Sequence, residues 1–363
     1  MSEAAYLAAV EEELRTIATA GIADQLAEID AELRPYAQSC TSAVTSGGKR
    51  LRPRFAYWGW RAGGGDSATW PSIVTVGAAL ELLHAAILVH DDIIDSAPLR
   101  RGQPSVRAAL AARHRERQWS GAASEFGDHT ALLVGDLLWA GAQDAMADVG
   151  AALPSSRRAD ITGQFRAMRL EVMAGQLLEL DAQAARLYTE EAADKIVTYK
   201  TSKYTVERPI ALGLTVSDAA AGDRRALGRF AAATGRAFQL RDDLADLYGP
   251  AGTSGKTPGG DIRDGKPTAL LGHALRLGSE TQLRTVHAVL GDAEADPAAI
   301  QDVARIFAAT GALAAVSDRV TALAEDARAA LTDAGANLTP AVLDGFHGLL
   351  KECTELSFLA PTQ

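Results

Sequence analysis

Two aspartate clusters with the same spacing lie about 150 residues apart in the chain. The first, at 91–95, reads Asp-Asp-Ile-Ile-Asp, and the second, at 242–246, reads Asp-Asp-Leu-Ala-Asp. On a helix that turns about 100° per residue, Asp at i, i+1 and i+4 falls on one side. Three carboxylates on one face repel each other, so a cation must compensate, and hard oxygen ligands suit Mg²⁺. Because Mg²⁺ usually shares its shell with phosphate oxygens, the clusters predict a magnesium- and diphosphate-binding cage.

The helix that leads to the first cluster carries a histidine near the same phase. His84 lies about 20° away from Asp91 in helical phase and ~10.5 Å down the axis, and Leu88 lies one turn below the acidic face. The pattern predicts a groove with metal at the helix end, an apolar wall beneath it and an imidazole at one side. From the residues alone, His84 is equally well explained as a core histidine or as a ligand contact.

Basic residues accompany both clusters and indicate a second, metal-free anion site. They are Lys49 and Arg52 after a Gly-Gly break, Arg100 and Arg101, Lys200 and Lys203 with Thr201, and Lys256 and Lys266 in and after a glycine-rich loop. Lys49 and Arg52 are three residues apart, which predicts that they share one side of a helix. Each pair alone is typical of a solvated surface. Together they indicate an anion site, because Arg binds phosphate oxygens in bidentate fashion and Lys supplies a point charge.

The elements that must position these residues are predicted to be helical. The chain has 363 residues, 47% of them hydrophobic, and shows no alternating strand pattern, which indicates an all-α fold in a single domain over 1–363. The expected helices cover 4–34, a segment that begins at Pro53, and then 71–95, 130–150, 157–187, 189–213, 222–248 and 266–277. Residues 113–129 are expected to form an exposed loop or a ragged helix end, and 249–265 a loop that closes over a site.

Composition excludes several classes of protein. The net charge of −10 argues against nucleic-acid binding, which requires a basic stripe. Two distant cysteines, Cys40 and Cys353, are expected to be reduced thiols. No uncharged apolar stretch reaches ~20 residues and no secretory leader is visible, so we expect a cytoplasmic protein without a transmembrane segment.

The ordered motifs resemble those of trans-polyprenyl diphosphate synthases. The matching segments are Gly47 to Pro53, Leu83-His84 through Asp95, Arg100-Arg101-Gly102, Gly175-Gln176, Lys200-Thr201, Phe238-Gln239, Asp242 to Asp246, Gly260-Asp261 and Gly265-Lys266. The resemblance covers about 45–275 and implies an all-α bundle around a deep central cavity, usually a homodimer. It implies condensation of isopentenyl diphosphate with an allylic diphosphate: the allylic C–O bond ionises, the isopentenyl carbon attacks, and a proton is lost.

The same resemblance assigns roles to individual residues. It places three Mg²⁺ ions on Asp91, Asp92, Asp95 and Asp242, with Asp243 and Asp246 acting through metal-bound water. It assigns Arg100, Lys200, Lys256 and Lys266 to the allylic diphosphate, and Lys49, Arg52, His84 and Arg101 to isopentenyl diphosphate. Thr201 and Gln239 are expected to stabilise the carbocation, and released pyrophosphate to be the final base. Preplaced positive charge explains why the leaving group needs no protein nucleophile.

Three features depart from the family pattern. Glu179 stands where Asp is usual after Gly175-Gln176, the 113–129 connection is long, and Arg241 adds a cation before the second cluster. The resemblance implies that residues before Asp91 set the product length, with Leu83, Ala86, Ile87 and Leu88 expected to line the channel. With no bulky aromatic there, the small Ala86 favours geranylgeranyl diphosphate, and C15 or C25 and longer products stay open.

Two other functions are compatible with parts of the pattern. A class I terpene cyclase shares the ionisation chemistry, but the second Asp-rich motif and the Lys49–Arg52 pair oppose it. A non-catalytic synthase subunit would have lost some of the acidic or basic site residues, and the principal ones are all present. A protein with merely acidic helix ends would not explain the ordered cations.

Overall fold

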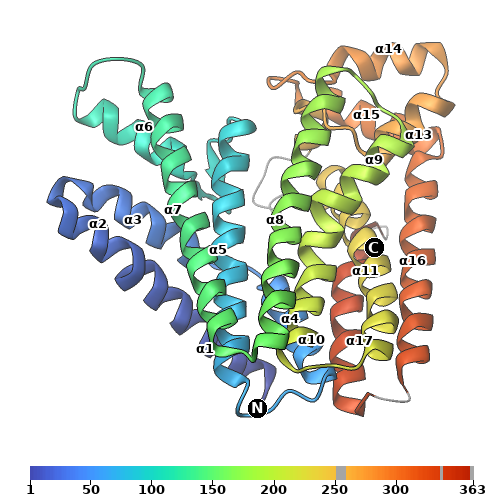
Figure 1. Ribbon diagram of the computed structural model, residues 1–363. Helices are drawn as coiled ribbons and strands as arrows, with labels where there is room; N and C mark the ends of the chain where they lie inside the picture. The colour runs from blue at the N-terminus through green and yellow to red at the C-terminus, as the bar shows by residue number, and fades with distance from the viewer. Residues whose placement is uncertain (251–258, 336–337, 360–363) are drawn as a thin grey trace. The chain divides into compact units, whose positions relative to one another are not determined.

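The computed structural model describes residues 1–250, 259–335 and 338–359, and it is almost wholly helical there (Figure 1). The predicted all-α fold is confirmed. The elements are α1 (Glu3–Thr16), the π-helix η1 (Ile17–Ala23), α2 (Asp24–Ile29), the 3-10 helix η2 (Ala31–Leu33), α3 (Arg34–Thr45), α4 (Leu51–Ala62), α5 (Trp70–Ile94), β1 (Leu99–Arg100), β2 (Gln103–Pro104), α6 (Val106–Glu116), α7 (Ala123–Ala152), α8 (Ser155–Ala184), α9 (Glu190–Ile196), the π-helix η3 (Val197–Glu207), α10 (Arg208–Val216), α11 (Ala221–Tyr248), α12 (Gly260–Arg263), α13 (Ala269–Leu277), α14 (Glu280–Val289), α15 (Pro297–Ala309), α16 (Ala312–Ala334), α17 (Pro340–Thr354) and the 3-10 helix η5 (Ser357–Leu359).

The chain divides into two compact units, each with its own packed helices. Unit 1 comprises Met1–Phe165 with Leu212–Ala219, and unit 2 comprises Arg166–Ala211 with Ala220–Gln363. The first aspartate cluster belongs to unit 1 and the second to unit 2, so each is described within its own unit. That 1–363 act as a single synthase domain stays a prediction.

Helix α5 forms the centre of unit 1 and carries the first aspartate cluster at its C-terminal end. Pro71 lies in its first turn, where the missing N–H costs no hydrogen bond. The helix is apolar almost all round and packs against α1, α4 and α7, as expected for a buried helix. Gly77 lets α1 approach, because a Cβ there would lie 2.4 Å from the Tyr6 hydroxyl oxygen. The helix is therefore a fixed support for Asp91.

Helix α5 is also apolar enough to raise the question of a membrane span. It is the single helix in the described part of the chain that is long and apolar enough to cross a bilayer. The most apolar window of α5 is 78% buried inside the structure, as in the core helix of a globular protein. The bent pair α15 and α16 passes the same test only when the two helices are counted together.

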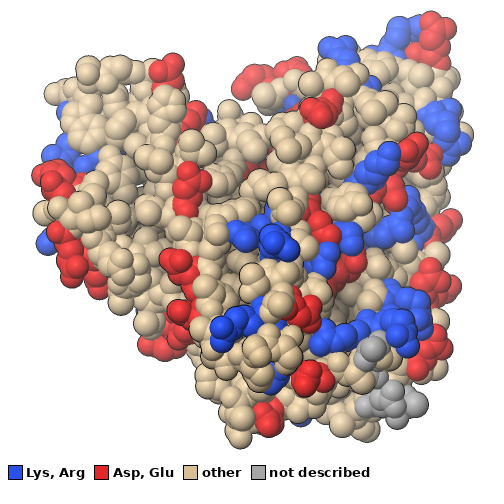
Figure 2. All heavy atoms as spheres, in the orientation of Figure 1, with Lys and Arg blue, Asp and Glu red and all other residues tan. Residues whose placement is uncertain are grey.

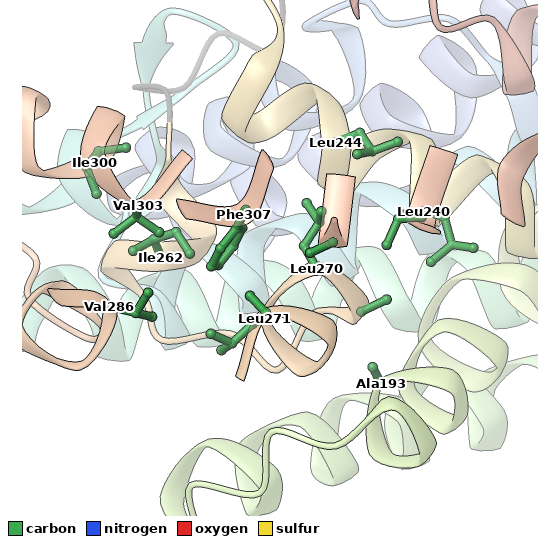
Figure 3. Packing of buried hydrophobic residues seen from close by; sticks show 14 of the residues in the cluster. Ala193, Leu240, Leu244, Ile262, Leu270, Leu271, Val286, Ile300, Val303 and Phe307 are labelled. Carbon is green, nitrogen blue, oxygen red and sulfur yellow. The ribbon is translucent and has the colours of Figure 1, made fainter. Parts of the chain in front are cut away.

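Unit 2 is built around α11, which packs against η3, α16 and α17. Its apolar side places Leu240 and Leu244 in a cluster with Ile262, Leu270 and Phe307 (Figure 3). All five side chains are nearly inaccessible to solvent. The apolar side thus fixes the rotation of α11, and with it the positions of the aspartates at 242–246.

Two predicted segments differ from the structure. The expected helix over 4–34 is wrong as one element, because α2 ends at Ile29 and Asp30 adopts an extended conformation that caps η2. Pro35 does not end that helix but lies in the first turn of α3. Residues 113–129, expected as an exposed loop or a ragged helix end, are instead helical for most of their length: α6 runs to Glu116 and α7 begins at Ala123.

The turn between α6 and α7 is closed by aromatic packing. The rings of His114 and Phe126 lie 5.0 Å apart, and those of Trp119 and Phe126 lie 5.2 Å apart. The Arg113 guanidinium lies 4.6 Å from the Trp119 ring centroid, a cation–π distance. These contacts explain why a polar, glycine-containing segment folds as a helical hairpin.

Charged side chains of both signs occur on the face of the molecule drawn in Figure 2. On the face shown in Figure 2, Lys and Arg are interspersed with Asp and Glu among the described residues drawn there. In unit 2, for example, Asp194 accepts hydrogen bonds from both Arg236 and Arg319. Acidic and basic side chains thus pair locally in this unit.

Candidate active site

The first aspartate cluster ends α5 and is compensated by an arginine from the following hairpin. Asp91 and Asp92 lie in the last turn, and Asp95 is the C-cap. Arg100 donates from Nε to Asp92 Oδ1 at 2.8 Å and from Nη2 to Asp91 Oδ2 at 3.2 Å. Burial lowers the pKa of Arg100, but the hydrogen bonds and charges of Asp92 and Asp91 outweigh it and raise the pKa overall. The guanidinium therefore offsets carboxylates that a helix C-terminus disfavours.

The β1–β2 hairpin explains the Arg-Arg-Gly motif. Arg101 and Gly102 are its two turn residues, with φ of 53° and 75°, as a tight two-residue turn requires. Arg100 thus stays on the strand beside the aspartates, while Arg101 turns toward the Gly-Gly break. There it donates to Ser46 Oγ at 3.1 Å and to the Gly47 carbonyl.

Gly48 is required where Arg101 meets the Gly-Gly break. Its φ of +131° is unfavourable for other residues, and a Cβ would lie 2.9 Å from Arg101 Nη2. The second glycine of the break is therefore what lets the guanidinium approach the backbone.

The charges of several arginines act on His84 of α5. Burial, followed by the charges of Arg52, Arg101, Arg100 and Arg50, lowers the pKa of His84 well below 6.5. Arg52 and Arg101 thus lie near enough for their charges to act on His84, and the substrate roles of these three residues stay predictions. Lys49 is exposed and precedes α4, and Arg50 beside it has a left-handed φ of 48°. The prediction that Lys49 and Arg52 share one side of a helix is wrong, because the helix begins only at Leu51.

His84 is expected to remain neutral at physiological pH, with a defined effect on stability. The unfolded chain binds a proton here near pH 6.5, whereas the folded chain binds it only at lower pH. The fold therefore loses stability as pH falls below 6.5, and His84 has no such effect at higher pH. A His84→Gln variant should lose less stability than wild type between about pH 7 and about pH 5 in denaturant titrations. Equal losses would show that the folded imidazole is protonated.

The second aspartate cluster lies on α11 and is strongly crowded by negative charge. The Asp242 side chain is 58% exposed, whereas Asp243 is buried. Burial, then the charges of Asp261, Asp242 and Asp246, raise the pKa of Asp243 well above its usual value, against the hydrogen bond from Gln239. The Asp261 N–H donates to Asp246 Oδ2 at 3.1 Å, which ties the α12 turn to the cluster.

A chain of hydrogen bonds connects the π-helix η3 to this cluster. Thr201 Oγ1 donates to Gln239 Oε1 at 2.6 Å, and Gln239 Nε2 donates to Asp243 Oδ1 at 2.6 Å. Insertions of π-helix are frequent at functional sites because they redirect side chains. The predicted residues Thr201, Gln239 and Asp243 are therefore physically linked.

Lys200 and Lys266 are both held by carboxylates in unit 2. Lys200 Nζ lies 2.7 Å from Glu179 Oε1, and Gly175 permits this packing because a Cβ there would lie 2.2 Å from the Lys200 backbone nitrogen. Lys266 Nζ lies 3.3 Å from Asp264 Oδ2 and 3.9 Å from Asp261 Oδ1. The longer side chain of Glu179 thus reaches a lysine predicted to bind substrate.

The chemistry of the second cluster fits a divalent cation shared with a phosphate ligand. Within the described ranges, no three His, Cys, Asp or Glu residues converge as a complete metal cage. Mg²⁺ is usually bound by one or two carboxylates together with water and substrate phosphate oxygens, so a complete protein cage is not required. Buried Asp243, whose pKa is raised by burial and by the charges of Asp261, Asp242 and Asp246, belongs to a carboxylate donor set whose repulsion such a cation would relieve. The residues therefore fit Mg²⁺ bound together with a diphosphate.

Comparison with known protein families shows a match that covers most of the chain. The family model described as polyprenyl synthetase matches residues 34–307. The chain belongs to the polyprenyl synthetase family. As a member, it is a trans-prenyltransferase, and the predicted family and class of enzyme are confirmed.

Relatives of this polyprenyl synthetase make products of different length. The chain is 30% identical to nonaprenyl diphosphate synthase of Mycobacterium tuberculosis over 313 residues, covering 85% of each. It is 28% identical to a short chain isoprenyl diphosphate synthase of Methanocaldococcus jannaschii, covering 78% of this chain and 81% of the relative. Family membership therefore establishes a prenyl diphosphate synthase but does not determine its product.

The similarity extends to solved structures. Geranylgeranyl pyrophosphate synthase from Corynebacterium glutamicum, complexed with isoprenyl diphosphate and magnesium, matches with a TM-score of 0.91 and 32% identity, covering 98% of this chain and 99% of the other. A decaprenyl diphosphate synthase from Rhodobacter capsulatus, at 23% identity and a TM-score of 0.76, shares the fold.

The remaining predicted residues of the synthase fall into two groups. Lys256 lies outside the described residues. Leu83 and Ala86 are fully buried on α5, and Ile87 and Leu88 are partly buried. Their role in product length stays a prediction.

Three contacts in the synthase were not predicted from the motifs. Arg50 pairs with buried Glu81, and His90 lies 3.4 Å from Asp136. Arg241, predicted only as an extra cation, donates to the Glu355 carbonyl at 3.4 Å and so binds the C-terminal segment. A single Glu in the apolar run before His84 was the one sequence signal for the first of these.

Proposed function

We propose that this synthase condenses isopentenyl diphosphate with dimethylallyl, geranyl or farnesyl diphosphate to give a longer all-trans prenyl diphosphate. The observation that carries the proposal is a basic group in which Arg101 binds the Gly-Gly break that precedes Lys49, in addition to two aspartate clusters. Carboxylates suit a metal-bound diphosphate, whereas an arginine-rich group suits a diphosphate bound without metal. Two different diphosphate sites imply two substrates, and therefore chain elongation.

In this proposal, basic side chains drive ionisation of the allylic substrate. Arg100, Lys200, Lys256 and Lys266 neutralise the charge that grows on pyrophosphate as the C–O bond breaks. Mg²⁺ supplies further charge stabilisation to the same leaving group. The oxygens of Thr201 and Gln239 stabilise the carbocation, and their hydrogen bond fixes both side chains. No protein nucleophile is needed.

The second substrate is held by the basic group near α4. Lys49, Arg52 and Arg101 bind isopentenyl diphosphate, with His84 as a neutral contact. The isopentenyl double bond attacks the allylic cation to form the new C–C bond. A proton is then lost to the released pyrophosphate, so charge and atoms balance.

We propose Asp91, Asp92, Asp95 and Asp242 as ligands of three Mg²⁺ ions, with Asp243 and Asp246 acting through bound water. The magnesium in the structure of the C. glutamicum relative supports this assignment, as does the carboxylate chemistry of the second cluster. That both clusters serve one allylic diphosphate rests on the order of the family motifs.

For the product we propose geranylgeranyl diphosphate, with C15 or C25 and longer as alternatives. The small Ala86 supports it, and so does the geranylgeranyl synthase among the similar structures.

We also propose that residues 1–363 act as one domain, that the enzyme is a homodimer and that it works in the cytoplasm. The match over 34–307, which spans both units, supports the single domain.

The proposed reaction is tested by elongation assays on the purified protein. With Mg²⁺, isopentenyl diphosphate and each of the three allylic primers in turn, we expect linear products with a dominant length of C20. EDTA should abolish turnover, and excess Mg²⁺ should restore it. Failure to elongate any primer would refute the synthase assignment. Cyclic hydrocarbon from an allylic diphosphate alone would favour a class I cyclase.

A further inference from the structure

A buried carboxylate lies one helical turn before His84 and has no role in the proposed reaction. Glu81 on α5 is 3% exposed. Its Oε2 lies 2.5 Å from Arg50 Nη1, while Oε1 is buried and makes no hydrogen bond among the described residues. A buried charge is costly unless it is well paired. The Glu81–Arg50 ion pair is therefore expected to hold the Arg50 side chain in one position.

Arg50 is bound at three points, none of which is a predicted substrate contact. Besides Glu81, it donates to Glu11 of α1 from Nε at 2.6 Å and from Nη2 at 3.2 Å. It also donates to the Val44 carbonyl at 3.0 Å. All the nitrogens of its guanidinium are thus engaged by protein groups, so Arg50 is an anchor rather than an open cation.

The backbone of Arg50 explains why an anchor is needed. Its φ of 48° and ψ of 40° are left-handed, a conformation that is unfavourable for residues other than Gly, Asn and Asp. This residue separates exposed Lys49 from Leu51, the first residue of α4, which Arg52 follows. Without the ion pairs, the chain would be free to relax to an extended or helical conformation and would carry Lys49 and Arg52 to new positions.

We infer that Glu81 is a positioning residue for isopentenyl diphosphate, acting through Arg50 on the backbone that presents Lys49 and Arg52. The inference rests on the proposed function of those two residues. Glu81 would have little effect on the allylic substrate, whose proposed contacts lie elsewhere. Glu11 is the weaker anchor, because its side chain is 38% exposed and its pairing is screened by water.

The test is Glu81→Gln, which keeps the shape of the side chain and removes its charge. We expect KM for isopentenyl diphosphate to rise roughly tenfold or more, the scale on which misplaced binding groups act. The allylic KM should be unchanged, and kcat should stay within about threefold. Calorimetric titration with isopentenyl diphosphate, without added metal, should show the same weakening. A change in general stability alone would not produce this split between substrates.

Two matched variants keep the inference falsifiable. Glu13→Gln also removes a carboxylate between α1 and α5, but Glu13 contacts Thr75, so both KM values should match wild type. Glu11→Gln should raise only the isopentenyl KM, by less than Glu81→Gln does, and it decides the matter if Glu81→Gln does not fold. An unchanged isopentenyl KM, or equal rises for both substrates, overturns the inference. If the wild-type protein elongates no primer, the proposed function has failed instead.

Discussion

Replacing Asp91 or Asp242 with Ala is expected to lower turnover at least ~100-fold, the scale of losing a preorganised charge-stabilising group. Each carboxylate is proposed to hold Mg²⁺ on the allylic diphosphate. Its loss removes charge stabilisation that grows as the C–O bond breaks, so kcat should fall more than the affinity for the substrate. Single-turnover product formation under saturating substrates measures this directly. Near-normal activity in both variants would contradict the metal assignment.

Stability provides the control for these two substitutions. The Asp242 side chain is 58% exposed, so its removal should leave the thermal midpoint close to wild type. Asp144 is an exposed aspartate on α7, and Asp144→Ala should change neither turnover nor stability. Asp91 accepts a hydrogen bond from Arg100, so a modest loss of stability is expected there. A large loss of stability in Asp242→Ala would show that its inactivity reflects unfolding.

The elements that hold the first cluster were predictable because local signals agreed. Pro71 begins α5, the apolar run continues through Leu83, and the aspartates mark its polar end. For residues 4–34, by contrast, the sequence signals did not predict the break in the helix at Asp30. The pattern predicts a helix that stops before Pro35, whereas in the structure Pro35 lies in the first turn of α3. Proline is favourable in a first turn and unfavourable in a helix interior, and the sequence pattern alone did not distinguish these cases.

The conformation around the basic site depends on contacts between residues far apart in sequence. Arg50 is left-handed in the presence of Glu81 and Glu11, which lie 31 and 39 residues away. No local pattern specifies such a conformation, so the displaced Lys49 could not be predicted. The π-helix η3 is a similar case. It packs closely on Gly175 and Gly235, where a Cβ would collide with Lys200 and Ser202.

Motif order indicates candidate site residues but not their mutual contacts. The sequence indicated Thr201, Gln239 and Asp243 separately, and the structure shows that they form one hydrogen-bonded chain. The sequence marked Glu179 only as a departure from the usual Asp, and the structure pairs it with Lys200. Spacing along a helix predicts which side a residue faces, whereas these pairings are set by how one helix packs on another.

The second prediction with a large effect concerns Arg100, which acts on both stability and turnover. Asp92 is 3% exposed, and Arg100 supplies the guanidinium beside it. Arg100→Met keeps much of the apolar stem but leaves a buried carboxylate without its cation. Breaking such a pair on one side costs about 3–5 kcal/mol. We therefore expect a clear fall in the denaturant midpoint, together with a loss of turnover because the leaving group loses a cation.

The double variant Arg100→Met/Asp92→Asn separates these two effects. Asn removes the buried charge while keeping the size of the side chain, so the denaturant midpoint should recover much of its loss. Turnover should not recover, since both the cation and a proposed metal ligand are then missing. A double variant as unstable as Arg100→Met would mean that Arg100 stabilises the hairpin by packing and not by its charge. Recovery of turnover along with stability would place Arg100 outside the chemistry, since its cation would then matter only for keeping Asp92 buried.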